Sequence, residues 1–363
     1  MVRICLILLF LALLMLVISG CDDFYPGPDL IHYSLILDGN SSVRVDNSLM
    51  VSSWGKAYYV SDQYIFHLGN KLVRRSMNQA GVVQMIPDNL SITDKYNMAI
   101  DTDNQLLYFA AGNAIYKISF DGSGMARISP DDGGIYSCPV LSPWADYLMA
   151  IRNSKMMRYK LDGNSWQEIL PTINASYAVY IPETEQYYFF RKYYEASSYK
   201  LGLFSYVLGD TISAPLINLT TTSSDFRPEC MVDPSGRYFA MKIQIQSWDG
   251  YSPGTILVYD RIEQDRIELA KGFCFTFSPV DDTMIYSRQM HGMADLNLIN
   301  LDTRQLTLLW DGYISQSSYS YSLEELYWRF DGQVLHIRGY KGYRNTESKS
   351  HSAKLLEPSG GDR

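Results

Sequence analysis

Short apolar runs separated by tight polar turns recur along this chain, and they fall into two kinds that alternate. No long amphipathic helical pattern follows residue 20, so strands are expected throughout. The first kind is a hairpin of two apolar strands around a tight polar turn. Seven stretches have this form, the first of them the weakest: 49–60, 97–109, 139–151, 178–190, 230–243, 275–287 and 326–337.

The second kind is a hairpin whose turn is often Asp-Gly, the strongest short-range signal for a reversal between strands. It also occurs seven times: at 33–45, 71–86, 115–129, 156–170, 203–219, 255–269 and 296–310. One hairpin of each kind makes a four-stranded unit of about 40 to 54 residues, the period at which propeller blades recur.

The order of the hairpins predicts how the chain closes. It starts with a hairpin of the second kind at 33–45 and ends with one of the first kind at 326–337, so each end holds half a blade. Joining the halves removes two open sheet edges. We therefore predict an all-β fold, a seven-bladed β-propeller over residues 31–340 whose N-terminal strands complete the last blade. Six or eight blades stay open, because the unit around 190–230 is long and Ala353–Leu356 could add a strand.

The first twenty residues predict export. Arg3 precedes an apolar run from Leu6 to Ile18, and thirteen residues are too few to span a bilayer comfortably. The junction Ile18-Ser19-Gly20-Cys21 resembles the lipobox of bacterial lipoproteins. We expect a signal peptide at 1–20, cleavage between Gly20 and Cys21, and lipid on Cys21. An uncleaved anchor or an ordinary signal peptide is the alternative.

The lipoprotein resemblance implies a diacylglycerol and a further N-acyl chain, such as palmitate, on Cys21. Two or more chains hold a protein on a membrane where one would let it exchange. Residues 21–30 would be the spacer, and the polar tail 341–363 a frayed end. We expect a cell-envelope protein that faces the periplasm or the exterior. Asp22 and Asp23 resemble an inner-membrane retention signal of enteric bacteria, and the choice of membrane stays open.

Composition and charge narrow the partners. Tyr alone supplies 29 of 363 residues, and together with Phe, Val, Ile and Thr it suits a half-buried pleated surface. The net charge is −8 and the pI is about 5.2, so the chain lacks the positive field that phosphate backbones require. We therefore expect a protein partner and no nucleic acid.

Three turn regions resemble a known family. SPWADYLMAI (142–151), DPSGRYFAM (233–241) and SPVDDTMIYS (278–287) look like the Ser-Pro-Asp-Gly-x-aromatic pattern of TolB-type and WD-repeat-like propellers. Pro fixes the entry to the turn, and small or acidic residues make the reversal. The chain departs from the pattern at 102–105 and 182–185. The resemblance implies a propeller fold and a scaffold role in protein contacts, and it assigns no binding residue.

The sequence offers no catalytic constellation. Its five histidines are dispersed without metal-ligand spacing, and no Gly-x-Ser-x-Gly elbow occurs. We expect no catalytic residue, no metal and no cofactor. Carboxylates at 101, 103, 131–132 and 281–282 fall in predicted turns and are interpreted as turn formers. Cys138, Cys230 and Cys274 are interpreted as small buried hydrophobes on innermost strands, with a Cys230–Cys274 disulfide as the alternative.

Aromatic density is the most suggestive remaining feature. Tyr and Trp dominate protein interfaces and also stack on sugars, although blade packing would use many of them. We expect loop positions to supply a contact surface, formed by Tyr193, Tyr194, Tyr251, Tyr313 and Tyr319. The predicted function is a membrane-tethered, non-catalytic protein-binding scaffold. The alternatives are a lyase or cyclase acting at the central channel, a carbohydrate-binding module, or a structural subunit of a larger envelope complex.

Overall fold

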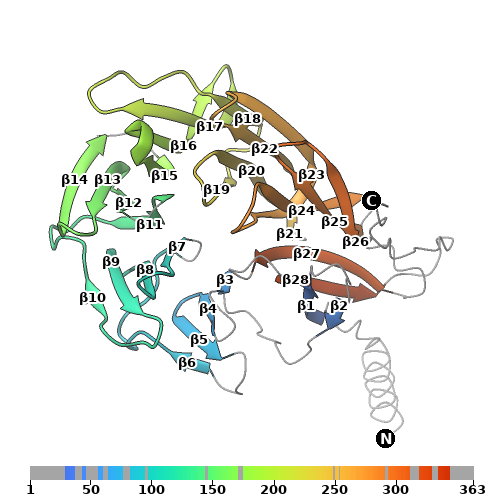
Figure 1. Ribbon diagram of the computed structural model, residues 1–363, viewed down its shortest axis with the longest axis horizontal. Coiled ribbons are helices and arrows are strands. Elements are labelled where there is room, and N and C mark those ends of the chain that lie inside the picture. Colours follow the sequence, from blue (N-terminus) through green and yellow to red (C-terminus); the bar gives the residue numbers. More distant parts are fainter. Residues whose placement is uncertain are drawn as a thin grey trace, which may run out of the picture.

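A computed structural model shows an all-β chain whose strands stand in sheets around a centre (Figure 1). It contains 28 strands and one 3-10 turn, Pro182–Thr184, in the part it describes. The described residues are 29–36, 43–45, 56–59, 64–76, 82–94, 97–143, 146–170, 175–247, 250–252, 254–290, 293–310, 319–328 and 334–343. The predicted signal peptide, Cys21, the spacer up to residue 28, Tyr313 and the tail from residue 344 lie outside them.

Four sheets follow one another along the chain, each of four antiparallel strands paired in chain order. Their members are β3 (Lys56–Tyr59), β4 (Tyr64–Leu68), β5 (Leu72–Ser76) and β6 (Val82–Gln84); β7 (Met98–Asp101), β8 (Leu106–Ala111), β9 (Ala114–Ser119) and β10 (Ala126–Arg127); β11 (Tyr136–Leu141), β12 (Tyr147–Arg152), β13 (Lys155–Lys160) and β14 (Ser165–Leu170); β15 (Ala175–Ile181), β16 (Gln186–Glu195), β17 (Ser198–Val207) and β18 (Ile217–Thr221).

The fifth sheet has eight strands, because β23 belongs to two groups at once. Its order is β19-β20-β22-β23-β24-β25-β26, and the short β21 pairs with β20. The first part of β23 pairs with β22 and its last part pairs with β24, with a register shift between Gly272 and Phe275. The members are β19 (Phe226–Val232), β20 (Tyr238–Ser247), β21 (Gly250–Ser252), β22 (Gly254–Asp260), β23 (Asp265–Phe277), β24 (Thr283–Met290), β25 (Met293–Asn300) and β26 (Leu306–Trp310).

The sixth sheet joins the two ends of the described chain. Its order is β2-β1-β28-β27, and its strands are β1 (Asp29–Ile36), β2 (Val43–Val45), β27 (Tyr319–Trp328) and β28 (Val334–Tyr343). Strand β1 pairs with β28 from Asp29↔Lys341 to Ile36↔Val334. Divided at β23, the described strands form seven four-stranded groups, here called blades. These are the pairings that a seven-bladed ring closed by N-terminal strands requires.

One predicted hairpin is paired differently where it can be seen. Of the hairpin predicted at 49–60, residues 49–55 and 60 lie outside the described residues, and the remaining strand β3 pairs forward with β4, from Lys56↔Leu68 to Tyr59↔Ile65. The reading ended the hairpin at residue 60 and left the next apolar run unassigned. That run carries Phe66 and Leu68, which are both completely buried, so packing selects it as the second strand.

The core lies between successive sheets. Phe66 and Leu68 of β4 share one apolar cluster with Leu107 and Phe109 of β8, and similar clusters join the following blades. Middle strands therefore bury both faces, as in β8, where five of the six residues are buried. Each fully buried side chain of this size contributes about 1.5–3 kcal/mol. Because the stabilising contacts lie between blades, each blade depends on its neighbours.

Candidate functional site

The strand order gives the ring two different faces. In each blade the first and second strands, and the third and fourth, are joined at one face, which we call the turn face. The second and third strands are joined at the opposite face, which we call the hairpin face. The two faces offer different chemistry, and each is described in turn.

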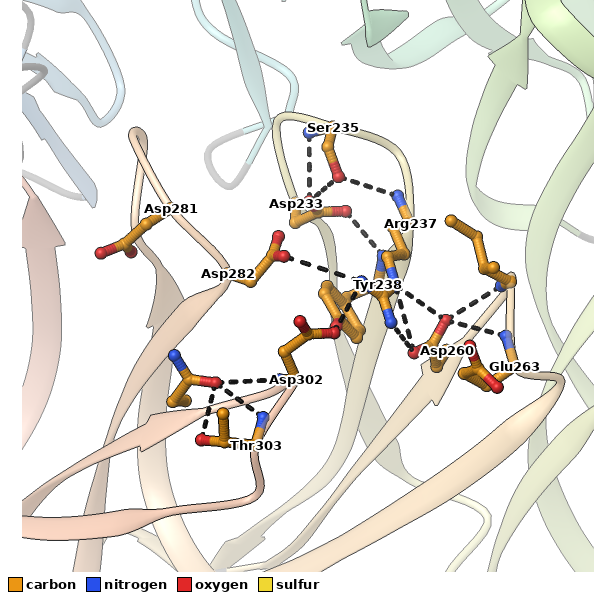
Figure 2. A network of polar contacts seen from close by, with 12 residues as sticks. Asp233, Ser235, Arg237, Tyr238, Asp260, Glu263, Asp281, Asp282, Asp302 and Thr303 are labelled. Carbon is orange, nitrogen blue, oxygen red and sulfur yellow. Dashed lines mark hydrogen bonds and ion pairs between the residues drawn. The ribbon is translucent and has the colours of Figure 1, made fainter.

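The turn face carries a polar network centred on Arg237 (Figure 2). Arg237 lies in the turn between β19 and β20. Its Nε and Nη2 donate to both carboxylate oxygens of Asp260, at 2.8–3.2 Å, at the end of β22 in the same blade. Its Nη1 lies 2.8 Å from Asp302 and 3.7 Å from Asp282, both in turns of the next blade. One guanidinium thus joins two blades.

The pKa values of this network follow from its geometry. Hydrogen bonding to Asp260 raises the pKa of Arg237 above its usual value. Burial alone would raise the pKa of Asp260, but the hydrogen bonds from Arg237 and from the backbone N–H groups of Glu263 and Ile262 outweigh it and lower that pKa. The ion pair is therefore fully charged at neutral pH.

A second acid shapes the turn that carries Arg237. Asp233 Oδ1 accepts the backbone N–H of Tyr238 at 2.7 Å, and its Oδ2 accepts the N–H of Ser235 at 3.1 Å (Figure 2). Burial raises the pKa of Asp233, and the hydrogen bonds from Ser235 and the backbone offset part of that shift. Asp233 therefore fixes the turn of the DPSGRYFAM segment (233–241), and with it the position of the Arg237 guanidinium.

Three other turn carboxylates accept backbone hydrogen bonds within their own turns, as predicted. Asp101 accepts the N–H of Asn104 at 3.0 Å, and Asp281 accepts the N–H of Thr283 at 3.2 Å and its hydroxyl at 2.6 Å. Asp132 accepts the N–H of Gly134, the interaction that most lowers its pKa. Within the ranges that the structure describes, no three His, Cys, Asp or Glu residues are grouped so that they could hold a metal ion.

The hairpin face is uneven around the ring, because its hairpins differ in length. Strands β8, β9, β12 and β13 have six residues each, whereas β16 and β17 have ten each. The innermost strand β15 pairs with β16 only as far as Arg191, and the β16–β17 ladder continues to Glu195↔Ser198. Four residues beyond β15 extend about 13 Å at the strand rise of about 3.3 Å. The tip of β16–β17 therefore extends beyond β15 at this face, while the outer strand β18 runs beside β17 as far as Tyr199.

Side chains at that tip form a small ordered group. Tyr194 is 62% exposed, and its ring lies 4.9 Å from that of its cross-strand partner Tyr199. Lys200 pairs with Glu195 at 2.7 Å, and the hydrogen bond that Lys200 donates to Glu195 raises the pKa of Lys200. Tyr193 points the other way: its ring packs on Phe204 and its hydroxyl is buried. Tyr194 is thus the exposed member of the predicted pair.

The structure corrects the prediction that these tyrosines lie on loops. Tyr193 and Tyr194 belong to β16, Tyr251 to β21, and Tyr319 begins β27. Long ladders explain the difference, because the strands continue where the sequence reading ended them. Tyr194 lies at the β16–β17 tip on the hairpin face. Tyr251 belongs to the same face because β21 lies in the connection between β20 and β22. Tyr319 belongs to it because the innermost strand β27 starts there. Topology thus brings together positions that are far apart in the sequence.

The innermost strand β19 carries charged groups that sequence reasoning missed. It is half-buried from Arg227 to Val232, unlike the largely buried β15. The ammonium group of Lys242, which is completely buried, lies 2.7 Å from the carboxylate of Glu229 directly across the ladder. Lys192 Nζ donates to the carbonyl of Phe226, and burial lowers the pKa of Lys192. Only the register brings these residues together, and no sequence spacing signals it.

The cysteines lie on innermost strands, as predicted. Cys138 and Cys274 are buried, and Cys230 is partly buried on β19 as a free thiol. The alternative Cys230–Cys274 disulfide is therefore not formed in this structure. Burial raises the pKa of the Cys230 thiol well above its ordinary value, and Glu229 adds to that shift. Tyr177 on β15 lies near this group, and burial also raises its pKa.

Comparisons with known proteins identify a fold. No protein-family model and no curated protein matches the chain. Among solved structures, TolB from Acinetobacter baumannii is 12% identical with a TM-score of 0.43, covering 90% of this chain and 68% of that one. A putative TolB from Agrobacterium tumefaciens is 12% identical with a TM-score of 0.45, covering 86% and 99%.

One further solved structure gives a higher score. The GH74 enzyme from Niastella koreensis is 10% identical with a TM-score of 0.54, covering 83% of this chain and 54% of that one. No helix among the described residues is long and apolar enough to cross a bilayer. With the antiparallel sheets around a centre, the likeness to the GH74 structure confirms the predicted fold class: the described chain is an all-β propeller.

Proposed function

We propose that this protein is a non-catalytic scaffold of the bacterial cell envelope, tethered by lipid on Cys21, whose hairpin face binds a protein partner. The tether rests on the lipobox-like junction and its apolar leader. The binding role rests on the β16–β17 tip.

The observation that carries the binding role is an exposed aromatic side chain that packs against its cross-strand neighbour. Tyr194 is 62% exposed on the part of β16 that the innermost strand β15 does not reach. Tyr199 and the Lys200–Glu195 ion pair lie beside it and limit its freedom. A stiff amphipathic ring that is ordered before binding loses little entropy on contact, which favours such residues as interface anchors.

A matched pair of positions tests the binding face. Val280 is 61% exposed and lies in the turn before β24, on the turn face. A photoreactive amino acid in place of Tyr194 should give one defined protein adduct in the envelope, and the same residue in place of Val280 should not. Tyr194→Ser should abolish co-purification of that partner, and Val280→Ser should preserve it. Equal adducts at both positions, or an adduct to glycan alone, would contradict the proposal.

A fractionation experiment tests the tether separately. Cys21→Ser should move the protein from the membrane to the soluble fraction, because two or more acyl chains at about 0.8 kcal/mol per buried methylene are then lost. A Cys21→Ser protein that still sediments with membranes would refute lipid anchoring and leave the binding face untouched.

A further inference from the structure

The first described strand, β1, begins at the hairpin face. In the sixth sheet, Asp29 of β1 pairs with Lys341 near the end of β28, and Tyr343 at that end pairs with Tyr319 at the start of β27. Innermost strands of this fold start at the hairpin face, as β15 does. The end of β28 and the start of β1 therefore occupy the position that the β16–β17 tip occupies in its own blade.

The sequence limits how far a lipid on Cys21 can lie from that point. Eight residue steps, with seven residues between, separate Cys21 from Asp29. At full extension they span about 26–29 Å, at about 3.3–3.6 Å per residue. A Gly-rich coil of this length would have a root-mean-square reach of about 14–17 Å, and Pro26 and Pro28 extend this segment beyond that value. The anchored end therefore stays within about 30 Å of the hairpin face.

The propeller could lie with either its hairpin face or its turn face toward the membrane, and the height of the blade makes the second orientation harder for the tether to reach. Strand β1 has eight residues, which rise about 26 Å at about 3.3 Å each. For the turn face to approach the bilayer, the tether would have to run back along the whole blade at nearly full extension. That conformation exceeds the average coil reach and carries a large entropic cost. With the hairpin face toward the bilayer, no such stretching is needed.

From this geometry we infer that the lipid tether holds the propeller with its hairpin face toward the membrane. The inference rests on the proposed anchoring at Cys21. The β16–β17 tip then points at the bilayer, and its Tyr194, Tyr199 and Lys200 are side chains suited to the headgroup region. The partner of this face is therefore a membrane-embedded protein that exposes a segment above the bilayer, and the turn face is open to the aqueous compartment.

Opposite ends of one strand provide the test. Ser197 precedes β17 at the hairpin face, and Asp210 follows it at the turn face; both are exposed. Ten strand residues separate these positions by about 30 Å. A fluorescent amino acid would replace Ser197 or Asp210 in the full, lipidated chain. Energy transfer would be measured to an acceptor on the headgroups of phosphatidylethanolamine–phosphatidylglycerol vesicles, with Cys21→Ser as the unanchored control.

This experiment distinguishes a wrong orientation from a wrong assignment of the anchor. We expect several-fold stronger transfer from position 197 than from position 210 in the anchored protein, and none from either in Cys21→Ser. Equal transfer, or stronger transfer from 210, in a protein that binds vesicles through Cys21 overturns the orientation alone. A wild-type chain that does not bind vesicles overturns the anchor, and the orientation with it. A partner crosslinked at position 194 that fractionates as a soluble protein contradicts the assigned partner class.

Discussion

Replacing Arg237 should destabilise the propeller far more than replacing an arginine in an exposed pair. Arg237→Ala removes the bidentate contact with Asp260, whose side chain is only 1% exposed, and the link to Asp302 in the next blade. Arg304→Ala is the matched control. Its guanidinium lies 3.3 Å from Asp265, and the two side chains are 37% and 63% exposed.

The expected magnitude follows from what remains around Asp260. Breaking a buried ion pair costs about 3–5 kcal/mol when it leaves an uncompensated charge. Asp260 keeps the backbone N–H donors of Ile262 and Glu263, and the Arg237 side chain is itself 18% exposed, so the loss is smaller. We expect Arg237→Ala to lower the free energy of unfolding by about 2–3 kcal/mol. Arg304→Ala should lower it by less than about 1 kcal/mol, the usual worth of an exposed pair.

Urea unfolding, monitored by tryptophan fluorescence, measures both losses in the free energy of unfolding, and the denaturant slopes of the variants and the wild type should be equal.

The pH dependence of stability gives a second test. The pKa of Asp260 is lower in the folded than in the unfolded protein. Its contribution to stability is therefore complete above the unfolded-state pKa of about 4 and is lost as the pH falls through the folded-state pKa. The difference between wild type and Arg237→Ala should therefore be constant near neutral pH and shrink below about pH 4. Equal losses for the two arginine variants, or a difference that grows on acidification, would refute the reasoning.

Three further predictions concern packing and reactivity. A Cβ on Gly272 would lie 2.2 Å from the Ser287 carbonyl oxygen, whereas one on Gly163 meets no atom closer than 3.6 Å. Gly272→Ala should thus cost about 1–3 kcal/mol or more in thermal unfolding and Gly163→Ala almost nothing, and equal melting temperatures would contradict this. The Cys230 thiol should alkylate much more slowly at pH 8 in the native protein than in urea, because burial raises its pKa; peptide mapping by mass spectrometry that finds equal rates would disprove it. Trp166→Phe removes the 2.8 Å hydrogen bond to the Ile128 carbonyl and should cost about 1 kcal/mol in urea unfolding, and a neutral result would show that water replaces the indole.

Local signals in the sequence were strong where turns are tight. The LDGNSW segment at 161–166 forms the β13–β14 turn, and the DPSGRY segment forms the β19–β20 turn through Asp233. These reversals depend on residues within five positions of one another, so chain-local chemistry is sufficient to define them. The same reasoning missed the β3–β4 pairing, where burial of Phe66 and Leu68 decided which run became the second strand.

For the candidate contact surface too, some features could be predicted from the sequence and others could not. The sequence proposed both Tyr193 and Tyr194 as contact residues and could not tell which of them is exposed, because the direction of each ring depends on packing against Phe204 of the neighbouring strand. Neither the Arg237 network nor the Lys242–Glu229 pair has a signal in sequence spacing. Arg237 and Asp302 are 65 residues apart and meet only because successive blades bring their turns to one face.

By itself, then, the sequence determined the strands, the tight turns and the alternation of two hairpin types, since these depend on local propensity and periodicity. Tertiary structure alone decided which strand of one blade faces which of the next, which tyrosine is exposed, and at which face the first described strand begins. Those features depend on register and on contacts between residues far apart in the chain, and a pattern of period two is the same on either side of a sheet.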